Sequence, residues 1–114
     1  MVKCVPAMKD AWAHDFECDR PMAWILATLN ASGPWTWVTR DKDAFGPYIS
    51  CAPFQGLQAR IYDLDGWDSN GPKYTADFMM RDDCGTERAL IEGVFLGMLG
   101  RLPARNVTRG EYYD

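Results

Sequence analysis

The chain has 114 residues, the usual size of one domain, and is long enough for a single hydrophobic core. With 47% hydrophobic residues, 13% aromatic residues and a net charge of only −4, the composition excludes an intrinsically disordered chain. Sixteen acidic residues outnumber twelve basic ones, and no clustered Lys/Arg face is apparent, so no nucleic-acid partner is expected.

The N-terminal residues contain no apolar segment of the length that a signal peptide needs. The most apolar stretch, residues 90–102, is too short and too polar to span a bilayer. We therefore expect a cytoplasmic protein with no membrane partner. In that compartment the four cysteines, Cys4, Cys18, Cys51 and Cys84, are expected to be thiols, most of them buried.

The N-terminal part, residues 1–17, is expected to be an irregular arm. The first regular element is a helix, with Asp19 as its N-cap and with Gly33 and Pro34 ending it. Its apolar residues recur at three- and four-residue steps, which is typical of a helix with one buried face. These residues are Met22, Ile25, Leu26 and Leu29.

After Pro34 the apolar period changes from 3.6 to 2, which predicts β-strands. Strands are expected at residues 35–40, 48–52, 57–63 and 73–81. The third could instead continue the second through a bulge near Pro53 and Gly56, so the sheet is expected to have three or four strands.

A second helix is expected from a Thr86 cap to about Arg101, ended by Pro103. Its apolar face would consist of Leu90, Ile91, Val94, Phe95, Met98 and Leu102. The polar tail, residues 104–114, is expected to lie over the surface. The order of helix, antiparallel strands and helix predicts a single α+β domain over residues 1–114, a two-layer sandwich with both helices on one sheet face.

Two cysteine patterns resemble reactive or metal sites. Cys4, His14 and Cys18 lack the paired spacing of zinc ligands, so no metal is expected. Cys84 precedes a helix N-terminus, which would activate a thiol, but the two aspartates before it oppose the thiolate. His14 is the only imidazole that could serve it as a base, and no catalytic residue is assigned.

Two further patterns are expected to be structural. Residues 63–71 are rich in Asp, Asn and Gly but lack the glycine and glutamate positions of a calcium loop, so a solvated turn is expected. Gly93, Gly97 and Gly100 line one side of the last helix and are expected to let it pack closely within the chain, with a dimer contact as the alternative. No cofactor is expected.

Two candidate binding surfaces remain. The sheet face away from the helices would carry Arg60, Tyr62, Asp77, Met79 and Arg81, with Arg40, Tyr48 and Ser50 joining it. Such a mixture is typical either of an interface centre or of a solvated face with cross-strand pairs, and the sequence leaves both open. As an interface, it would form a homodimer in which Arg of one chain faces Asp of the other.

The second candidate surface is an aromatic pocket between the sheet and the helices. It would be lined by Trp35, Trp37, Tyr48 and Phe54. Aromatic walls with a few polar groups are common in ligand pockets, although four aromatic residues are equally normal for a core.

A resemblance to a known family rests on residues 29–35 (LNASGPW), Trp37, Gly46–x–Tyr48 and Arg60–Ile61. From Met22 onward the chain resembles short uncharacterised bacterial proteins, some of them encoded by integron gene cassettes of the mobile metagenome. That family has no assigned activity, so the resemblance implies a bacterial accessory protein from mobile DNA and no catalytic residue. The element order is also similar to the double-stranded-RNA-binding fold, but the basic patch of that fold is missing.

The expected function is therefore a non-catalytic binding or interaction protein whose partner is a small molecule or a protein. The alternative is a small enzyme or small-molecule carrier that uses the aromatic pocket.

Overall fold

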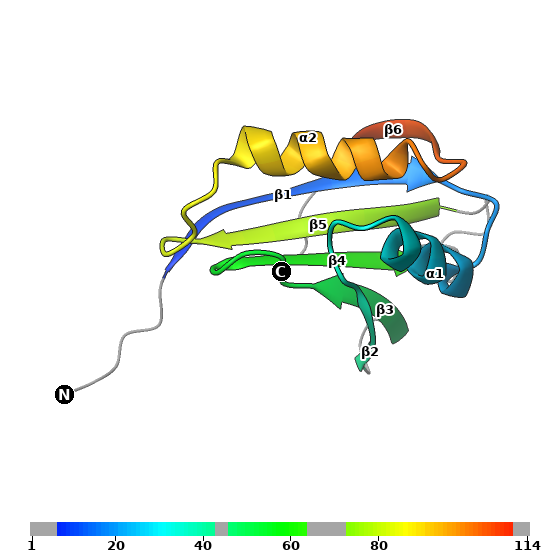
Figure 1. Ribbon diagram of the computed structural model, residues 1–114, viewed down its shortest axis with the longest axis horizontal. Coiled ribbons are helices and arrows are strands. Elements are labelled where there is room, and N and C mark those ends of the chain that lie inside the picture. Colours follow the sequence, from blue (N-terminus) through cyan, green and yellow to red (C-terminus); the bar gives the residue numbers. More distant parts are fainter. Residues whose placement is uncertain (1–6, 43–45, 64–72, 111–114) are drawn as a thin grey trace.

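The computed structural model describes residues 7–42, 46–63 and 73–110, which form an α+β fold (Figure 1). Its strands are β1 (Met8–Glu17), β2 (Val38–Lys42), β3 (Gly46–Cys51), β4 (Leu57–Asp63), β5 (Lys73–Arg81) and β6 (Arg105–Gly110). They form one sheet in the order β2-β3-β4-β5-β1-β6, and all neighbouring pairs are antiparallel. The helices are α1 (Met22–Ser32) and α2 (Arg88–Leu99). The predicted class and antiparallel sheet are confirmed, whereas the expected three or four strands are too few.

One of the added strands is β1, so the irregular arm expected over residues 1–17 is wrong for residues 8–17. β1 lies between β5 and β6 in the sheet. Trp12, His14 and Phe16 are buried at every second position and pair in register with the buried residues of β5. The strand-like alternation of large side chains was thus present in the sequence, with Ala13 and Asp15 at the intervening positions.

The other added strand is β6, in the tail that was expected only to cover the surface. It pairs with the outer edge of β1, and its side chains anchor it to the end of that strand. Arg105 donates to both carboxylate oxygens of Asp19, at 2.8 and 3.0 Å, and Asn106 donates to Glu17. A polar segment therefore becomes a strand because a neighbouring strand offers it backbone partners.

Both predicted side-chain caps are wrong. α1 has Pro21 at its N-cap position and α2 has Glu87, and neither helix receives a side-chain cap hydrogen bond. The carboxylate of Asp19 binds Arg105 instead of a helical amide. The helices themselves were predicted because their apolar spacing, more than their caps, identifies them.

The corner between α1 and β2 explains why the first predicted strand begins too early. The Asn30 side chain accepts a hydrogen bond from the Trp37 amide at 2.7 Å and donates one to the Trp37 carbonyl at 3.0 Å. These backbone groups are therefore occupied by a side chain rather than by a neighbouring strand. Trp35 and Trp37 are both buried in this corner, and the ladder begins only at Val38.

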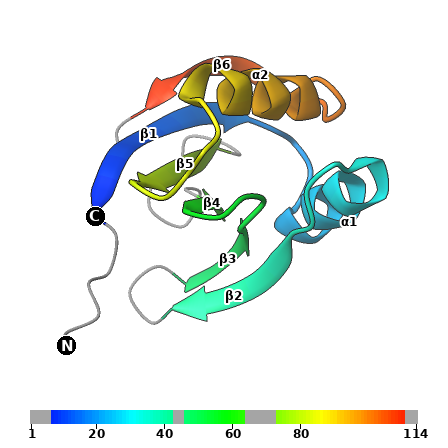
Figure 2. The same cartoon turned by 60° about the vertical axis from the view of Figure 1, so that its left-hand side comes forward.

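Both helices lie on the same side of the curved sheet (Figures 1 and 2). The core between them centres on Phe78 of β5, whose ring stacks on Trp12 at 5.2 Å and meets Phe95 of α2 edge-on at 4.9 Å. Trp35 also approaches this ring edge-on, at 6.3 Å. Aromatic packing of this kind joins the helix layer to the middle of the sheet.

The strands β3 and β4 form a hairpin rather than one bulged strand, because Cys51 pairs with Ala59 across the turn at residues 52–56. The predicted bounds of β4 and β5 are confirmed, as is the alternation of their core-facing residues. This hairpin turn forms one border of the groove described below.

Candidate functional site

The sheet face away from the helices is less open than the sequence indicates. Tyr62, Thr75 and Asp77 are only 9%, 5% and 4% exposed. Arg60 donates to both carboxylate oxygens of Asp77, at 2.8 and 2.9 Å, and its guanidinium lies 5.3 Å from the centre of the Tyr62 ring. The Arg–Asp contact expected between two chains is thus made between neighbouring strands of one chain, which removes the main argument for a dimer through this face.

Burial governs the electrostatics of this pair. Desolvation raises the pKa of Asp77 above its ordinary value, whereas the hydrogen bonds and the charge of Arg60 act to lower it. The pair is therefore a structural element of the sheet that holds β4 to β5.

The four aromatic residues predicted to line one pocket occupy different places. Trp35 and Trp37 are buried in the core, at 5% and 1% exposure. Tyr48 packs against Tyr62 on the opposite face of the sheet, with ring centres 5.0 Å apart. Phe54 lies in the hairpin turn, is 38% exposed and meets Trp35 edge-on. The structure therefore brings Trp35 into ring contact with Trp37 and Phe54, each at 6.3 Å, as packed core and turn residues, whereas Tyr48 lies apart from them.

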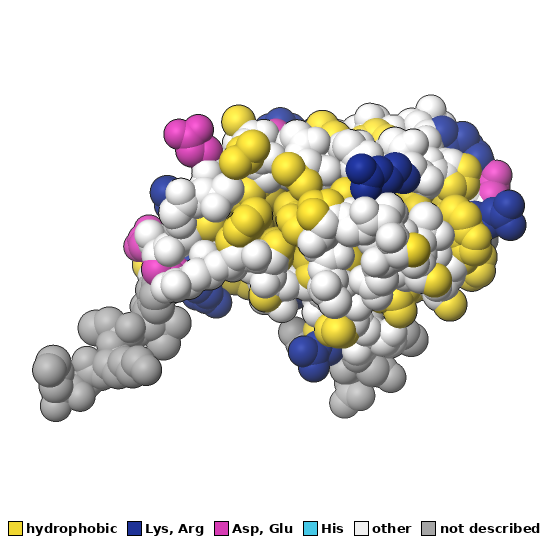
Figure 3. Space-filling model, in the orientation of Figure 1, with side chains coloured by type: hydrophobic (Ala, Val, Ile, Leu, Met, Phe, Trp, Pro, Cys, Tyr) yellow, Lys and Arg dark blue, Asp and Glu magenta, His cyan; other side chains and the backbone are white. Residues whose placement is uncertain are grey.

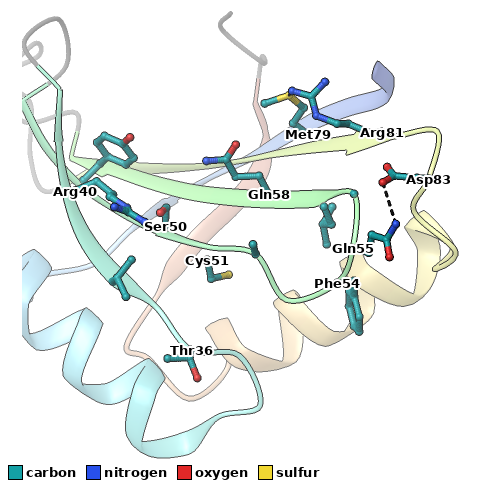
Figure 4. Close-up of a pocket in the computed structure, with 15 residues that line it drawn as sticks. Thr36, Arg40, Ser50, Cys51, Phe54, Gln55, Gln58, Met79, Arg81 and Asp83 are labelled. Carbon is teal, nitrogen blue, oxygen red and sulfur yellow. Dashed lines mark hydrogen bonds between the residues drawn. The ribbon is translucent and has the colours of Figure 1, made fainter. Parts of the chain in front are cut away.

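An open groove of about 720 Å³ instead lies beside the hairpin turn and reaches from β2 to β5 (Figure 4). It is lined by Thr36, Val38, Arg40, Tyr48, Ser50, Cys51, Ala52, Phe54, Gln55, Gly56, Leu57, Gln58, Met79, Arg81 and Asp83. The groove combines Tyr48 and Phe54 of the predicted aromatic set with Met79 and Arg81 of the predicted interface. Arg40 and Ser50, which were expected to join that interface, also line it, whereas the other predicted residues do not: Trp35, Trp37, Arg60, Tyr62 and Asp77.

The border of the groove is fixed where the hairpin turn meets the segment after β5. The Arg81 amide donates to the Gly56 carbonyl at 2.7 Å, and the Gln55 amide group donates to Asp83 at 3.2 Å. Gly56 has φ +78°, and a Cβ there would lie 2.5 Å from an Asp83 carboxylate oxygen and 2.7 Å from the Cys84 nitrogen. Only glycine fits this close approach without a shift of the backbone.

The groove carries charge at both of its sides. Arg40 projects from β2 and Arg81 from β5, on the sheet side away from the helices, and Asp83 lies next to the hairpin turn (Figure 4). One guanidinium nitrogen of Arg81 lies 3.6 Å from the Met79 sulfur. Arg40 is exposed, and it forms no ion pair within the described part of the chain. An exposed guanidinium beside apolar and amide side chains suits a carboxylate or phosphate.

The imidazole of His14 and the three thiols that the structure describes, Cys18, Cys51 and Cys84, are buried. Burial raises the pKa of Cys51, which lines the groove, to about 12, so this thiol stays protonated at neutral pH. Cys84 donates to the Thr86 carbonyl, with sulfur and oxygen 3.6 Å apart, and makes no hydrogen bond with His14. His14 packs between the rings of Phe78 and Phe95, and desolvation lowers its pKa.

The metal patterns have no support in the described residues. Within ranges 7–42, 46–63 and 73–110, no three His, Cys, Asp or Glu side chains are grouped as a metal site would need. Cys4 and residues 64–71 of the calcium-like segment lie outside the described residues. Neither described helix is long and apolar enough to span a bilayer.

No family model, curated protein or solved structure matches this chain. The resemblance to integron-cassette proteins therefore stays a prediction, and the function is argued from the groove. Four of its polar residues were absent from the predicted sites: Thr36, Gln55, Gln58 and Asp83. The alternation of the strands places Gln58 on the correct face, whereas Gln55 and Asp83, 28 residues apart, meet only through the tertiary fold.

Proposed function

We propose that this protein is a non-catalytic binding protein that takes a small anionic molecule into the groove beside the hairpin turn. The observation that carries the proposal is the combination of a groove of about 720 Å³ with Arg40 on its wall, which is exposed and has no ion pair among the described residues. Pockets for small molecules have volumes of roughly 300–1,000 Å³ and combine apolar walls with a few polar groups.

The lining residues suggest how such a molecule is held. Arg40 binds its carboxylate or phosphate, because a guanidinium donates two parallel hydrogen bonds to these groups. Val38 and Phe54, which are 44% and 38% exposed, contact its apolar part. The side chains of Ser50 and Gln58 offer further donors and acceptors.

Binding without catalysis is supported by the chemistry of the lining. Cys51, the thiol of the groove, is protonated by burial, and His14, the imidazole of the chain, lies in the core between aromatic rings. In this proposal the protein is an accessory factor that captures or senses a metabolite, which agrees with the role that the sequence resemblance implies.

The alternative, a small enzyme or carrier with an aromatic pocket between sheet and helices, has less support. Trp35 and Trp37 fill that layer and make ring contacts there, including Trp35 stacked on Phe95 at 6.5 Å. A ligand in that layer would have to displace packed aromatic rings, which costs much of the core packing.

A thermal-shift screen with carboxylates, phosphates and amines of similar size tests the proposal. A ligand at 100 times its Kd stabilises the native state by about 2.7 kcal/mol. For a domain of this size each kcal/mol shifts Tm by roughly 4 °C or more. We expect such a rise with one class of anions, a loss of the rise in Arg40→Gln, and an unchanged rise in Arg20→Gln, which alters an exposed arginine outside the groove.

Two results would contradict this assignment. One is a rise in Tm that Arg40→Gln leaves intact, which would locate the ligand elsewhere. The other is stabilisation by amines alone, because Arg40 repels cations at this wall.

A further inference from the structure

The outer face of α2, which points away from the core, carries no polar side chain. Its exposed residues are Ala89, Leu90, Gly93, Leu96 and Gly97, and Gly100 continues the row just beyond the helix. Leu90 is 61% exposed and Leu96 is 43% exposed. The prediction that Leu90 faces the core is therefore wrong, while Ile91 and Phe95 do face it. Figure 3 shows hydrophobic side chains on the visible surface of α2.

A helix that is apolar on its outer as well as its inner face is normally buried on both sides. The polar flank of α2 consists of Arg88 and Glu92, which pair with each other at 2.8 Å. The apolar row thus continues along the outer face for the whole helix. A surface row of this kind is typical of a contact with another molecule.

The glycines of this row have no packing role within the chain. A Cβ at Gly93 or Gly97 would meet nothing within 4 Å, so the expectation that they allow close packing inside the domain is wrong. Glycine destabilises a helix interior relative to alanine, and no internal contact offsets this cost. A close approach by a second helix would offset it.

We propose that two copies of this chain pack their α2 helices antiparallel, with a twofold axis that crosses the outer face near the level of Phe95. This symmetry places Gly93 of one copy beside Gly97 of the other. It also places Leu90 at the level of Gly100 of the other copy, and Leu96 within one residue of the level of Gly93. Each exposed leucine then meets a glycine, so the face is complementary to itself, as an isologous contact requires.

The charges at the two ends of α2 favour a second copy over an unrelated partner. Glu87 precedes the helix and is exposed, and it pairs with no basic residue in the described ranges. Arg101 follows the helix and is exposed, and among the described residues its side chain donates to the carbonyls of Ser32 and Gly33 and pairs with no carboxylate. Under the proposed symmetry, Glu87 of one copy and Arg101 of the other are offset by two residues along the helix axis. At the helical rise per residue this offset is about 3 Å. Opposite charges therefore meet at both ends of the contact.

Light scattering coupled to size-exclusion chromatography, over a range of chain concentrations, tests this dimer. We expect twice the 12.9 kDa of one chain at micromolar concentration. Leu96→Glu is expected to weaken the dimer about tenfold or more in Kd, because it brings an unpaired charge into a dry contact. Val107→Glu is the matched control, since Val107 is similarly exposed, at 40%, but lies on β6.

Two further variants separate the dimer from an effect on folding. In a monomer, Gly93→Ala would simply stabilise α2 and raise Tm, whereas in the proposed dimer it also weakens association because the added methyl separates the helices. Glu87→Arg is expected to weaken the dimer, and the double variant Glu87→Arg/Arg101→Glu is expected to restore it by exchanging the paired charges. Circular dichroism of each variant establishes that it is folded.

Three results would overturn the proposal. If the native chain stays monomeric at about 100 μM, a concentration at which even a weak specific dimer would form, the outer face of α2 does not bind a second copy. A dimer that folded Leu96→Glu fails to weaken lies elsewhere on the molecule. Failure of the double charge exchange to restore a dimer weakened by Glu87→Arg excludes the antiparallel arrangement.

Discussion

Replacement of Arg60 by methionine tests how far the buried pair on the sheet stabilises the fold. The Arg60 and Asp77 side chains are only 12% and 6% exposed, and Arg60 holds the carboxylate through two hydrogen bonds of 2.8 and 2.9 Å. Methionine keeps much of the side-chain volume but leaves the carboxylate buried without this partner. Breaking a buried ion pair on one side costs about 3–5 kcal/mol. Domains are stable by only about 5–15 kcal/mol, so the loss will be large.

The double variant Arg60→Met/Asp77→Leu is the decisive comparison. Once both members of the pair are apolar, neither leaves a buried charge without its partner, and such replacements are often neutral or stabilising by about 1–4 kcal/mol. We therefore expect the double variant to unfold at a urea concentration close to, or above, that of the native chain. If the double variant is as unstable as Arg60→Met, the loss comes from packing of Arg60 on Tyr62 rather than from the isolated charge.

The pH dependence of the stability difference between Arg60→Met and the native chain provides an independent test of the same explanation. Burial raises the folded-state pKa of Asp77, and Arg60 opposes this rise, so the pKa is expected to be higher still in Arg60→Met. As the pH falls from 7 toward 4.5, the folded variant then takes up a proton before the unfolded chain does. The stability of Arg60→Met relative to the native chain should therefore recover with acidification. A constant difference across this range would refute the assignment of the loss to the Asp77 charge.

Three further predictions concern single positions. Gly56→Ala should lower stability by about 1 kcal/mol or more through strain at positive φ, whereas Gly85→Ala, which adds a Cβ in open space, should change it little; urea unfolding compares them. Because burial lowers the pKa of His14, stability should fall as the pH drops below about 6.5, where the unfolded chain takes up the proton first, and His14→Phe should flatten this fall in urea titrations at pH 5 to 7. Asn30→Ala should lose about 1 kcal/mol or more, because both backbone groups of Trp37 lose their partner, and Asn30→Asp should lose less, because it still accepts from the Trp37 amide; equal losses in thermal unfolding would contradict this.

The parts of the fold that were predictable have strong local periodicity. The apolar spacing of residues 22–29 identified α1, and the alternation in residues 57–63 and 73–81 identified β4 and β5 with their core-facing residues. The alternation of Trp12, His14 and Phe16 would also have identified β1. By contrast, residues 105–110 have no apolar pattern, and they form β6 because β1 provides hydrogen-bond partners and Asp19 holds Arg105.

The candidate sites depended on tertiary structure to a greater extent. Sequence alternation placed Arg60 and Asp77 on one face, but it did not distinguish a contact within the chain from one between chains. The register of β4 against β5 decided this, because it sets the two residues directly opposite each other. Likewise, one border of the groove is formed where Gln55 of the hairpin turn contacts Asp83, from a distant part of the chain.

The fold class, the two helices and the inward-facing residues of β4 and β5 were predictable, because hydrophobic periodicity is a property of consecutive residues. Which apolar side chains are covered depends instead on how the helices and the sheet pack. Leu90 and Ile91 are equally apolar neighbours, yet Leu90 is exposed and Ile91 is buried, because the sheet packs against one side of α2 and not the other. Contacts between segments distant in sequence set the burial of each side chain. Burial in turn sets the pKa of a cysteine and decides whether a leucine is available to a partner.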